Sequence, residues 1–241
     1  QAGIGADITF AFDELTSLID PYDYQVEALA RTHAWAERSL AEVKRLREAR
    51  PDKPYQALFG VLQGANYEDL RKQTAAFLGA MDFDGYGIGG ALEKETMAQT
   101  IQWVNQSLPE NRPRHLLGIS EPDDIFAAIE QGIDTFDCVS PTRVARNGAA
   151  YTPCGRVNVR GQKYRELFEP IMENCDCYTC RNYTAAYLCH LLHARESLAG
   201  TLLSIHNERF IVKLVDDIRA SLEDGTFYEF REAFLATYYR R

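Results

Sequence analysis

The sequence lacks the features that place a protein in a membrane or on the secretory route. Its 241 residues contain no apolar run approaching about 18 residues, so no transmembrane helix is expected. The N-terminus has no basic stretch followed by an apolar one, so no signal peptide is predicted. There is also no initial methionine, and the apolar pattern begins almost at once, so we expect the sequence to start inside a longer protein.

Basic residues are in the minority. The chain has 26 Lys and Arg against 35 Asp and Glu, a net charge of −9. A nonspecific polyanion binder would be broadly basic, so this class is disfavoured, although a local basic site is not excluded. One stretch does gather positive charge, and it could be a solvated surface or a local basic site: Arg143, Arg146, Arg156, Arg160, Lys163 and Arg165.

Short apolar runs alternate with amphipathic helical stretches over the first two-thirds of the chain. The runs span residues 7–12, 57–62, 85–88, 115–119 and 134–139. The helical stretches span 25–50, 67–81, 94–108 and 122–131. This alternation predicts an α/β protein with a parallel sheet that is buried on both faces.

Polar or glycine-rich pairs follow the predicted strands, at 13–14, 63–64, 89–90 and 137–138. Functional residues at the C-terminal ends of successive strands are typical of a TIM-type (β/α)8 barrel, and a doubly wound sheet is the alternative. Only five strands are predicted, so we expect a barrel that lacks its N-terminal strands. Such an open barrel would expose its edges, so the isolated chain should aggregate and be inactive.

The pattern changes after Pro153, where a cysteine-bearing loop precedes predicted helices at 179–198, 207–222 and 227–239. No linker rich in proline, glycine or serine separates the two parts. We therefore predict that residues 1–153 form the C-terminal portion of the barrel. Residues 154–241 are expected to form a zinc-binding helical appendage with the closing helices.

Three of the six cysteines crowd into Cys175-Asp-Cys177-Tyr-Thr-Cys180. Thiolates bind Zn2+ in a tetrahedral shell, and close spacing brings three sulfurs together at small entropic cost. The fourth ligand could be His190, His193 or His206, and the spacing does not choose among them. The alternative is three incidental thiols in a turn.

Carboxylate and amide side chains at the strand ends are candidate catalytic and binding groups. Asp137 could be a nucleophile, as in glycosidases with covalent intermediates, or could cap the loop that follows. Asp13 and Gln63 suit the donor and acceptor edge of a purine, or they could be turn and capping residues. Gly89-Gly90 would let a flat base approach the backbone, although such a pair is a weak signal alone.

Together these motifs resemble the tRNA-guanine transglycosylases, or queuine tRNA-ribosyltransferases, from end to end of the chain. The Phe-Asp-Cys-Val-x-Pro-Thr-Arg run joined to the zinc spacing is the most specific part. The matching elements are Ala11-Phe-Asp-Glu14, Gly60-Val-Leu-Gln-Gly64, Gly87-Ile-Gly-Gly90, Leu117-Gly-Ile-Ser-Glu-Pro-Asp-Asp124, Thr135-Phe-Asp-Cys-Val-Ser-Pro-Thr-Arg143, Ala145-Arg-Asn-Gly148, and Cys175-x-Cys177-x2-Cys180 with His206.

The resemblance implies a role for each matching residue. Asp137 matches the nucleophile that attacks C1′ of the wobble ribose, expels guanine and forms a covalent RNA–enzyme adduct. The base is held at Asp13, Gln63, Gly89 and Gly90, with Leu117 packing near it. Anticodon-loop contacts match Gly118, Ile119, Ser120, Glu121, Pro122, Asp123 and Asp124, and Thr142, Arg143, Val144, Ala145 and Arg146. Cys175, Cys177, Cys180 and His206 match the ligands of one zinc ion, which is structural because no position is left open.

The activity implied by the resemblance is exchange of guanine 34 in G-U-N anticodons for a 7-substituted deazaguanine, without a redox cofactor. The expected partners are the tRNA anticodon loop and the small base, in a cytoplasmic homodimer with no membrane association. Two rivals remain: a noncatalytic partner subunit or inactive fragment, and an archaeosine-type enzyme. Retention of Asp137 between Phe136 and Cys138 argues against the noncatalytic subunit.

The chain departs from the family pattern at two places. The family carries a second aspartate, a proton acceptor, in a Ser-Asp-Ser-Gly-Gly-Phe-Gln motif that is absent here. The common bacterial form has Gly-Gly-Leu-Ala-Val-Gly-Glu where this chain has Gly89-Gly-Ala-Leu-Glu-Lys-Glu95. Because the Leu92-Glu93-Lys94 segment matches the side that holds the substituent of the incoming base, the choice between preQ1 and queuine stays open.

Overall fold

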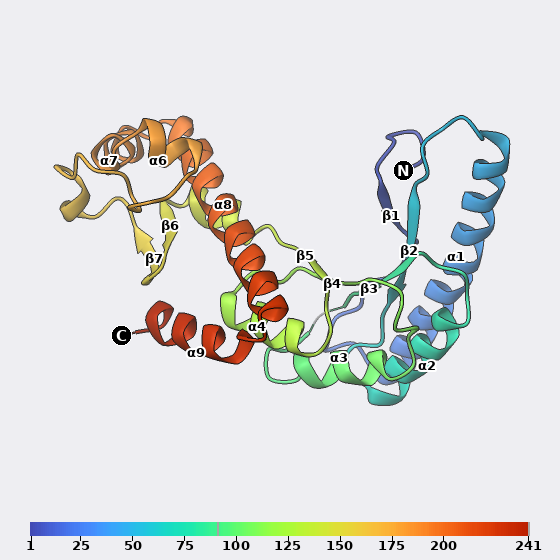
Figure 1. Cartoon of the computed structure of the whole chain (residues 1–241). Coiled ribbons are helices and arrows are strands. Elements are labelled where there is room, and N and C mark those ends of the chain that lie inside the picture. The colour runs from blue at the N-terminus through green and yellow to red at the C-terminus, as the bar shows by residue number, and fades with distance from the viewer. Residues whose placement is uncertain (91, 241) are drawn as a thin grey trace. The chain divides into compact units, whose positions relative to one another are not determined.

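A computed structural model describes residues 1–90 and 92–240 of the chain (Figure 1). The chain divides into two compact units, Gln1–Asp137 and Cys138–Arg241. Each unit has its own cluster of buried apolar side chains. The functional division expected after residue 153 stays a prediction. Within the described ranges, no helix combines the length and the apolar character needed to cross a bilayer.

A parallel sheet with strands in sequential order forms the centre of the first unit. The strands are β1 (Ile8–Phe10), β2 (Ala57–Leu62), β3 (Gly85–Ile88), β4 (Arg114–Leu117) and β5 (Thr135–Asp137). Each pairs in parallel with the next, in the order β1-β2-β3-β4-β5. A doubly wound sheet would reverse this order at a switch point, so that alternative is wrong. The unit is an α/β half-barrel with a curled five-stranded sheet (Figure 1).

Each connection between these strands contains one helix, as the apolar spacing predicted. The helices are α1 (Tyr22–Ala49), α2 (Glu68–Gly79), α3 (Met97–Asn105) and α4 (Pro122–Glu130). α4 begins at a proline and has two acidic residues in its first turn, which suits the positive end of the helix dipole. The core between helices and sheet includes Leu62, Phe83, Ile88, Ile101 and Leu116, all fully buried.

The strand register brings the C-terminal strand ends to one edge of the sheet. Leu62 pairs with Ile88, Ile88 with Leu116, and Leu117 with Asp137. In parallel α/β sheets this edge is where ligands bind. The residues that follow β1 to β5 in the sequence therefore lie at the same end of the sheet.

The second unit opens with elements that the sequence did not predict. They are α5 (Ser140–Arg146), the antiparallel hairpin of β6 (Ala149–Thr152) and β7 (Gly155–Asn158), and the 3-10 turn η1 (Gln162–Tyr164). The predicted helix at 179–198 is instead two helices, α6 (Tyr178–Asn182) and α7 (Ala185–Ala194). The Thr184 hydroxyl caps the start of α7, and Arg195, with a φ of 60°, ends it.

Helix α8 (Ser197–Glu223) organises the second unit, and α9 (Phe227–Tyr238) follows it as predicted. α8 begins well before the predicted residue 207, so His206 lies inside the helix. Its neighbour Asn207 is fully buried. The Asn207 side chain donates to the carbonyl oxygens of Pro141 and Ala149 at 3.0 and 3.1 Å and accepts from the Tyr151 amide at 2.9 Å. One side chain thereby ties α5 and β6 to α8.

Candidate active site and metal centre

The side chains of Asp13 and Gln63 meet at the ends of β1 and β2. Gln63 Nε2 donates to Asp13 Oδ2 at 2.6 Å, and Gln63 is only 3% exposed. Among the described residues, Gln63 Oε1 is a buried acceptor without a hydrogen-bond partner. An unpaired buried acceptor costs free energy, so a ligand donor would be stabilised next to it. The pair thus offers a carboxylate and an amide side by side.

Gly89 and Gly90 follow β3 and lie next to Gln63. Gly90 has a φ of +100°, and a Cβ there would lie 2.8 Å from Arg71 Nη2 and 3.0 Å from Gln63 Oε1. A Cβ on Gly89 would lie 3.0 Å from Gln63 Nε2 and 3.4 Å from Leu117 Cδ1. The positive φ favours glycine at position 90, and a Cβ at position 89 would require the neighbouring side chains to shift, so the bare backbone can approach a flat ligand closely. The structure brings together all five residues that the sequence assigned to the base.

Arg71, on α2, supports this corner and was missed by the sequence analysis. Its side chain is fully buried, and burial lowers the pKa of its guanidinium. Nε donates to the Ala65 carbonyl oxygen at 2.8 Å, and Nη1 donates to that of Gly89 at 2.8 Å. In the sequence it looks like one more charged residue on an amphipathic helix, so no local signal distinguishes it.

Asp137 ends β5 and contacts a second residue that the sequence analysis missed, His115. His115 Nε2 lies 2.9 Å from Asp137 Oδ1, and the Gly118 amide donates to the same oxygen at 3.3 Å. On its other side, His115 Nδ1 lies 2.8 Å from the Thr135 hydroxyl. The Asp137 side chain is 58% exposed and that of His115 13%. The Asp137 carboxylate is therefore held by His115 and Gly118 through Oδ1 and is still accessible to solvent.

The two segments matched to the anticodon loop differ in which side chains are accessible. In the first segment, Ser120 is buried, and Asp123 and Asp124 both pair with Lys94. Burial raises the pKa of Asp124 against the effect of that lysine. The second segment lies on α5 in the second unit, where Arg143 and Arg146 are exposed and Ala145 is fully buried. The arginine side chains are thus the accessible cations of α5.

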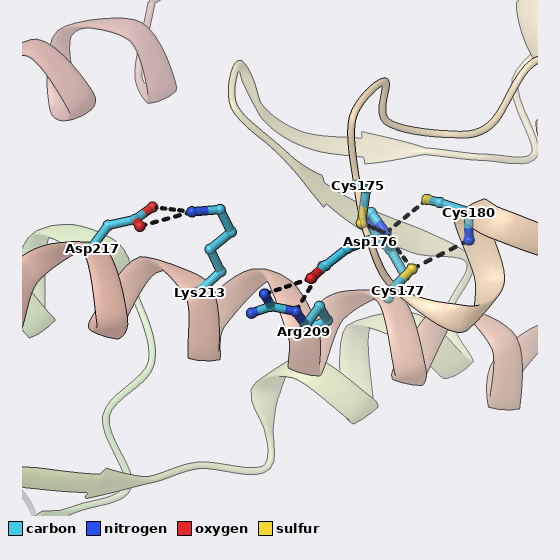
Figure 2. Close-up of polar contacts among 8 residues, drawn as sticks. Cys175, Asp176, Cys177, Cys180, Arg209, Lys213 and Asp217 are labelled. Carbon is cyan, nitrogen blue, oxygen red and sulfur yellow. Dashed lines mark hydrogen bonds and ion pairs between the residues drawn. The ribbon is translucent and has the colours of Figure 1, made fainter.

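A cluster of potential metal ligands lies in the second unit. The ligand atoms of Cys175, Cys177, Cys180 and His206 all lie within 4.8 Å of one another. Figure 2 shows the three cysteines. The three Sγ atoms are 3.7, 3.7 and 3.4 Å from His206 Nδ1. Tetrahedral zinc, with bonds of about 2.3 Å to sulfur and about 2.1 Å to nitrogen, places sulfur and nitrogen about 3.6 Å apart. The cluster therefore fits a Cys3His zinc site.

The other two histidine candidates lie outside this cluster. His190 and His193 are exposed on α7. His193 Nε2 lies 3.1 Å from the carbonyl oxygen of Arg160. The spacing of residues in the sequence could not make this choice, because it depends on α8 carrying His206 to the cysteine loop.

Contacts around the cluster orient its ligands. His206 Nε2 lies 2.8 Å from the Tyr151 carbonyl oxygen, which fixes the ring so that Nδ1 faces the sulfurs. Asp176, between the cysteines, pairs with both Nε and Nη2 of Arg209 on α8, at 2.7 and 2.8 Å (Figure 2). Such a two-point pair is geometrically specific and joins the loop to the helix.

Hydrogen bonds within the cluster make the acidities of its thiols unequal. A hydrogen bond from Cys180 lowers the pKa of the Cys177 thiol, and the same contact raises the pKa of Cys180. Burial lowers the pKa of His206, but contacts with Cys175 and Cys177 outweigh burial and raise it to about 9. Cys177 is therefore the thiol that ionises most readily, and thiolates are the form of cysteine that binds metal, whereas His206 must release its proton to bind.

Comparison with known proteins agrees with the motifs. The family model for queuine tRNA-ribosyltransferase matches residues 1–240. The queuine tRNA-ribosyltransferase of Symbiobacterium thermophilum is 47% identical over 238 residues, 98% of this chain and 58% of the relative. Those of Streptococcus equi subsp. zooepidemicus and Lactococcus lactis subsp. cremoris are 44% identical over 241 residues, 99% of this chain and 62% and 61% of the relatives. The chain thus spans about three-fifths of the length of these curated relatives.

Proposed function

The chain belongs to the queuine tRNA-ribosyltransferase family, and we propose from this premise that the complete protein is a tRNA-guanine transglycosylase. It replaces guanine 34 of G-U-N anticodons with preQ1 or queuine. The observation that carries the proposal is the placement of an accessible, anchored carboxylate, Asp137, and a carboxylate–amide pair, Asp13 and Gln63, after the C-terminal ends of strands of one parallel sheet.

The pocket offers groups complementary to guanine. Its Watson–Crick edge carries N–H donors and one carbonyl acceptor. The Asp13 carboxylate and the unpaired Gln63 Oε1 accept from the donors, and the Gly90 backbone N–H donates to the carbonyl. A 7-substituted deazaguanine has the same edge, so one pocket can hold both the leaving base and the incoming one. Leu117 packs against a face of the base.

The exchange proceeds in two balanced displacements at C1′ of the ribose. In the first, a carboxylate oxygen of Asp137 forms a bond to C1′ while the bond from C1′ to N9 of guanine breaks, and the electron pair leaves with guanine. In the second, the incoming base attacks C1′ and releases Asp137. Guanine gains one proton and the incoming base loses one, so no net acid or base is consumed.

Several finer features belong to the same proposal. The half-barrel is part of a TIM-type (β/α)8 barrel, as the sequential strand order supports. The bound metal is one structural zinc ion held by Cys175, Cys177, Cys180 and His206, and it supplies folding free energy, not chemistry. Exposed arginines of α5 contact phosphates of the anticodon loop. The protein works as a cytoplasmic homodimer.

The rival proposal is a noncatalytic subunit that binds RNA or a partner chain. A subunit without chemistry has no need to hold a nucleophile. The two donors that converge on Asp137 Oδ1 therefore favour the enzyme.

The test is Asp137→Asn in the complete protein. Wild type should form a tRNA adduct that survives SDS gels and should exchange labelled guanine into tRNA. The variant should form no adduct and should exchange at least about 1,000-fold more slowly, as expected for loss of a nucleophile. Asp52→Asn, an exposed loop change of the same chemistry, should behave as wild type. Near-normal exchange by Asp137→Asn would assign the covalent role to another carboxylate.

A further inference from the structure

His115 connects two residues of the neighbouring strand. It pairs in register with Thr135, and Leu117 pairs with Asp137, so positions 115, 135 and 137 present side chains on one face of β4 and β5. The imidazole contacts both: Nδ1 is 2.8 Å from Thr135 Oγ1 and Nε2 is 2.9 Å from Asp137 Oδ1. Groups carried on paired strands are held more precisely than groups on loops.

The ring is also fixed from the side of β1. The centroids of Phe10 and His115 lie 5.3 Å apart, and only 13% of the His115 side chain is exposed. A ring packed in this way cannot rotate freely about its side-chain torsions. Its nitrogens therefore keep their directions toward Thr135 and Asp137.

The Asp137 carboxylate decides which ring nitrogen carries the proton. An ionised carboxylate only accepts, so Nε2 carries the proton that faces it, and Nδ1 of the neutral imidazole accepts from the Thr135 hydroxyl. Nε2–H then donates to Asp137 Oδ1, beside the Gly118 amide, which donates to the same oxygen. Both of these hydrogen bonds therefore hold one carboxylate oxygen, Oδ1.

We propose that His115 is the positioning residue for the nucleophile. This inference rests on the proposed function. His115 and the Gly118 amide hold Oδ1, so that Oδ2 faces the ribose and forms the bond to C1′ as the bond from C1′ to N9 breaks. His115 keeps its proton throughout, because its hydrogen bond stays on the oxygen that forms no bond. Thr135 acts one step further away, by hydrogen-bonding Nδ1 and so holding the ring in this orientation.

The experiment measures single-turnover adduct formation and tRNA affinity separately, in the complete protein. His115→Phe keeps a ring against Phe10 but removes the donor. A hydrogen bond to a charged group stabilises by about 1.5–3 kcal/mol, so adduct formation should slow about 10- to 100-fold at saturating tRNA. The tRNA dissociation constant and the melting midpoint should stay within about two-fold and a few degrees of wild type. His115→Gln, which can place an amide N–H near Asp137, should recover most of the rate.

Thr135→Val is the second variant, because it changes one exposed hydroxyl and leaves the ring in place. Adduct formation should slow about 3- to 10-fold, while Thr237→Val, an exposed hydroxyl on α9, should have no effect. A normal rate in His115→Phe, or in Thr135→Val if His115→Phe does not fold, overturns the proposal. So does a loss confined to tRNA affinity, or equal rates in His115→Phe and His115→Gln. Adduct formation by Asp137→Asn, run in parallel, would instead refute the proposed nucleophile itself.

Discussion

Arg71 donates through Nη1 to the carbonyl oxygen of Gly89 at 2.8 Å, from the interior of α2 to the end of β3. Its Nε holds the Ala65 carbonyl oxygen, in the loop after β2, at 2.8 Å. The buried Arg71 guanidinium therefore holds two backbone segments next to Gln63, the loop that follows it and the end of the neighbouring strand β3. Burying a charge without a carboxylate partner costs several kcal/mol, which the carbonyl contacts must offset. The shape of the proposed base pocket thus depends on the backbone that this guanidinium holds.

Gly90→Ala should damage the base pocket more than the fold. A Cβ at this position meets Arg71 Nη2 and Gln63 Oε1, and the positive φ adds about 1–2 kcal/mol of strain. The KM for the free base in the exchange assay should rise at least about 10-fold, with tRNA affinity unchanged. Gly225→Ala, also at positive φ but in open space, is the matched control. It should lose only about 1 kcal/mol of unfolding free energy, and equal KM values in the two variants would refute the pocket assignment.

Glu14→Gln should reduce stability in a way that depends on pH. Glu14 pairs with Arg31 through two bonds, at 2.6 and 2.9 Å, and accepts from Tyr24; the Arg31 hydrogen bond contributes most to lowering its pKa to about 2. A depressed carboxyl pKa stabilises the folded state above its usual value of 4.5, and this stabilisation is lost as the pH falls toward 2. Wild type should exceed the variant by about 1 kcal/mol at pH 7. Urea unfolding of both proteins from pH 7 to pH 3 should show the gap closing; a constant gap would contradict it.

The parallel sheet of the first unit could be predicted because its strands and helices alternate with clear apolar spacing. The second unit could not be predicted as well, because tertiary contacts decide its elements. α5 and the β6–β7 hairpin are held by Asn207, whose partners lie far away in the sequence. The break between α6 and α7 depends on a threonine cap and a left-handed arginine, which apolar periodicity does not register.

The same limit applies to the site. Asp137 and Gln63 can be recognised in the sequence because they lie at the ends of predicted parallel strands, where functional residues are expected. His115 was counted as part of a strand, and its partners at positions 135 and 137 become visible only once β4 and β5 are in register. Arg71 gives no sign of burial, because its sequence neighbours other than Leu70 are polar or charged. Both residues act through others, and such roles are set by three-dimensional contacts.

Arg143→Ala should weaken tRNA binding through charge. Arg143 is exposed on α5, and removing one cation that faces a phosphate should lower the slope of log affinity against log salt by about 1. At low salt the tRNA dissociation constant should rise about 3- to 10-fold, with the adduct-forming step unchanged once tRNA is saturating. Arg219→Ala on α8 removes the same exposed charge outside the predicted RNA segments. If both variants reduce affinity equally, net charge and not a site on α5 is responsible.

Zinc binding should be lost in His206→Ala and kept in His193→Ala. His206→Ala removes the nitrogen that lies 3.4–3.7 Å from all three sulfurs, whereas His193→Ala removes one that contacts only a backbone carbonyl among the described residues. Elemental analysis should find about one zinc per chain in wild type and in His193→Ala, and little in His206→Ala. In chelator competition, His206→Ala should bind zinc at least about 100-fold more weakly, because a direct ligand matters more than the outer contacts that typically contribute 10- to 100-fold.

Zinc binding is linked to folding, so the melting midpoint of His206→Ala should fall and should no longer respond to added chelator. The melting midpoint of His193→Ala should fall with chelator as in wild type. Full zinc in His206→Ala, with loss in His193→Ala, would reverse the assignment and require α7, not α8, to complete the site.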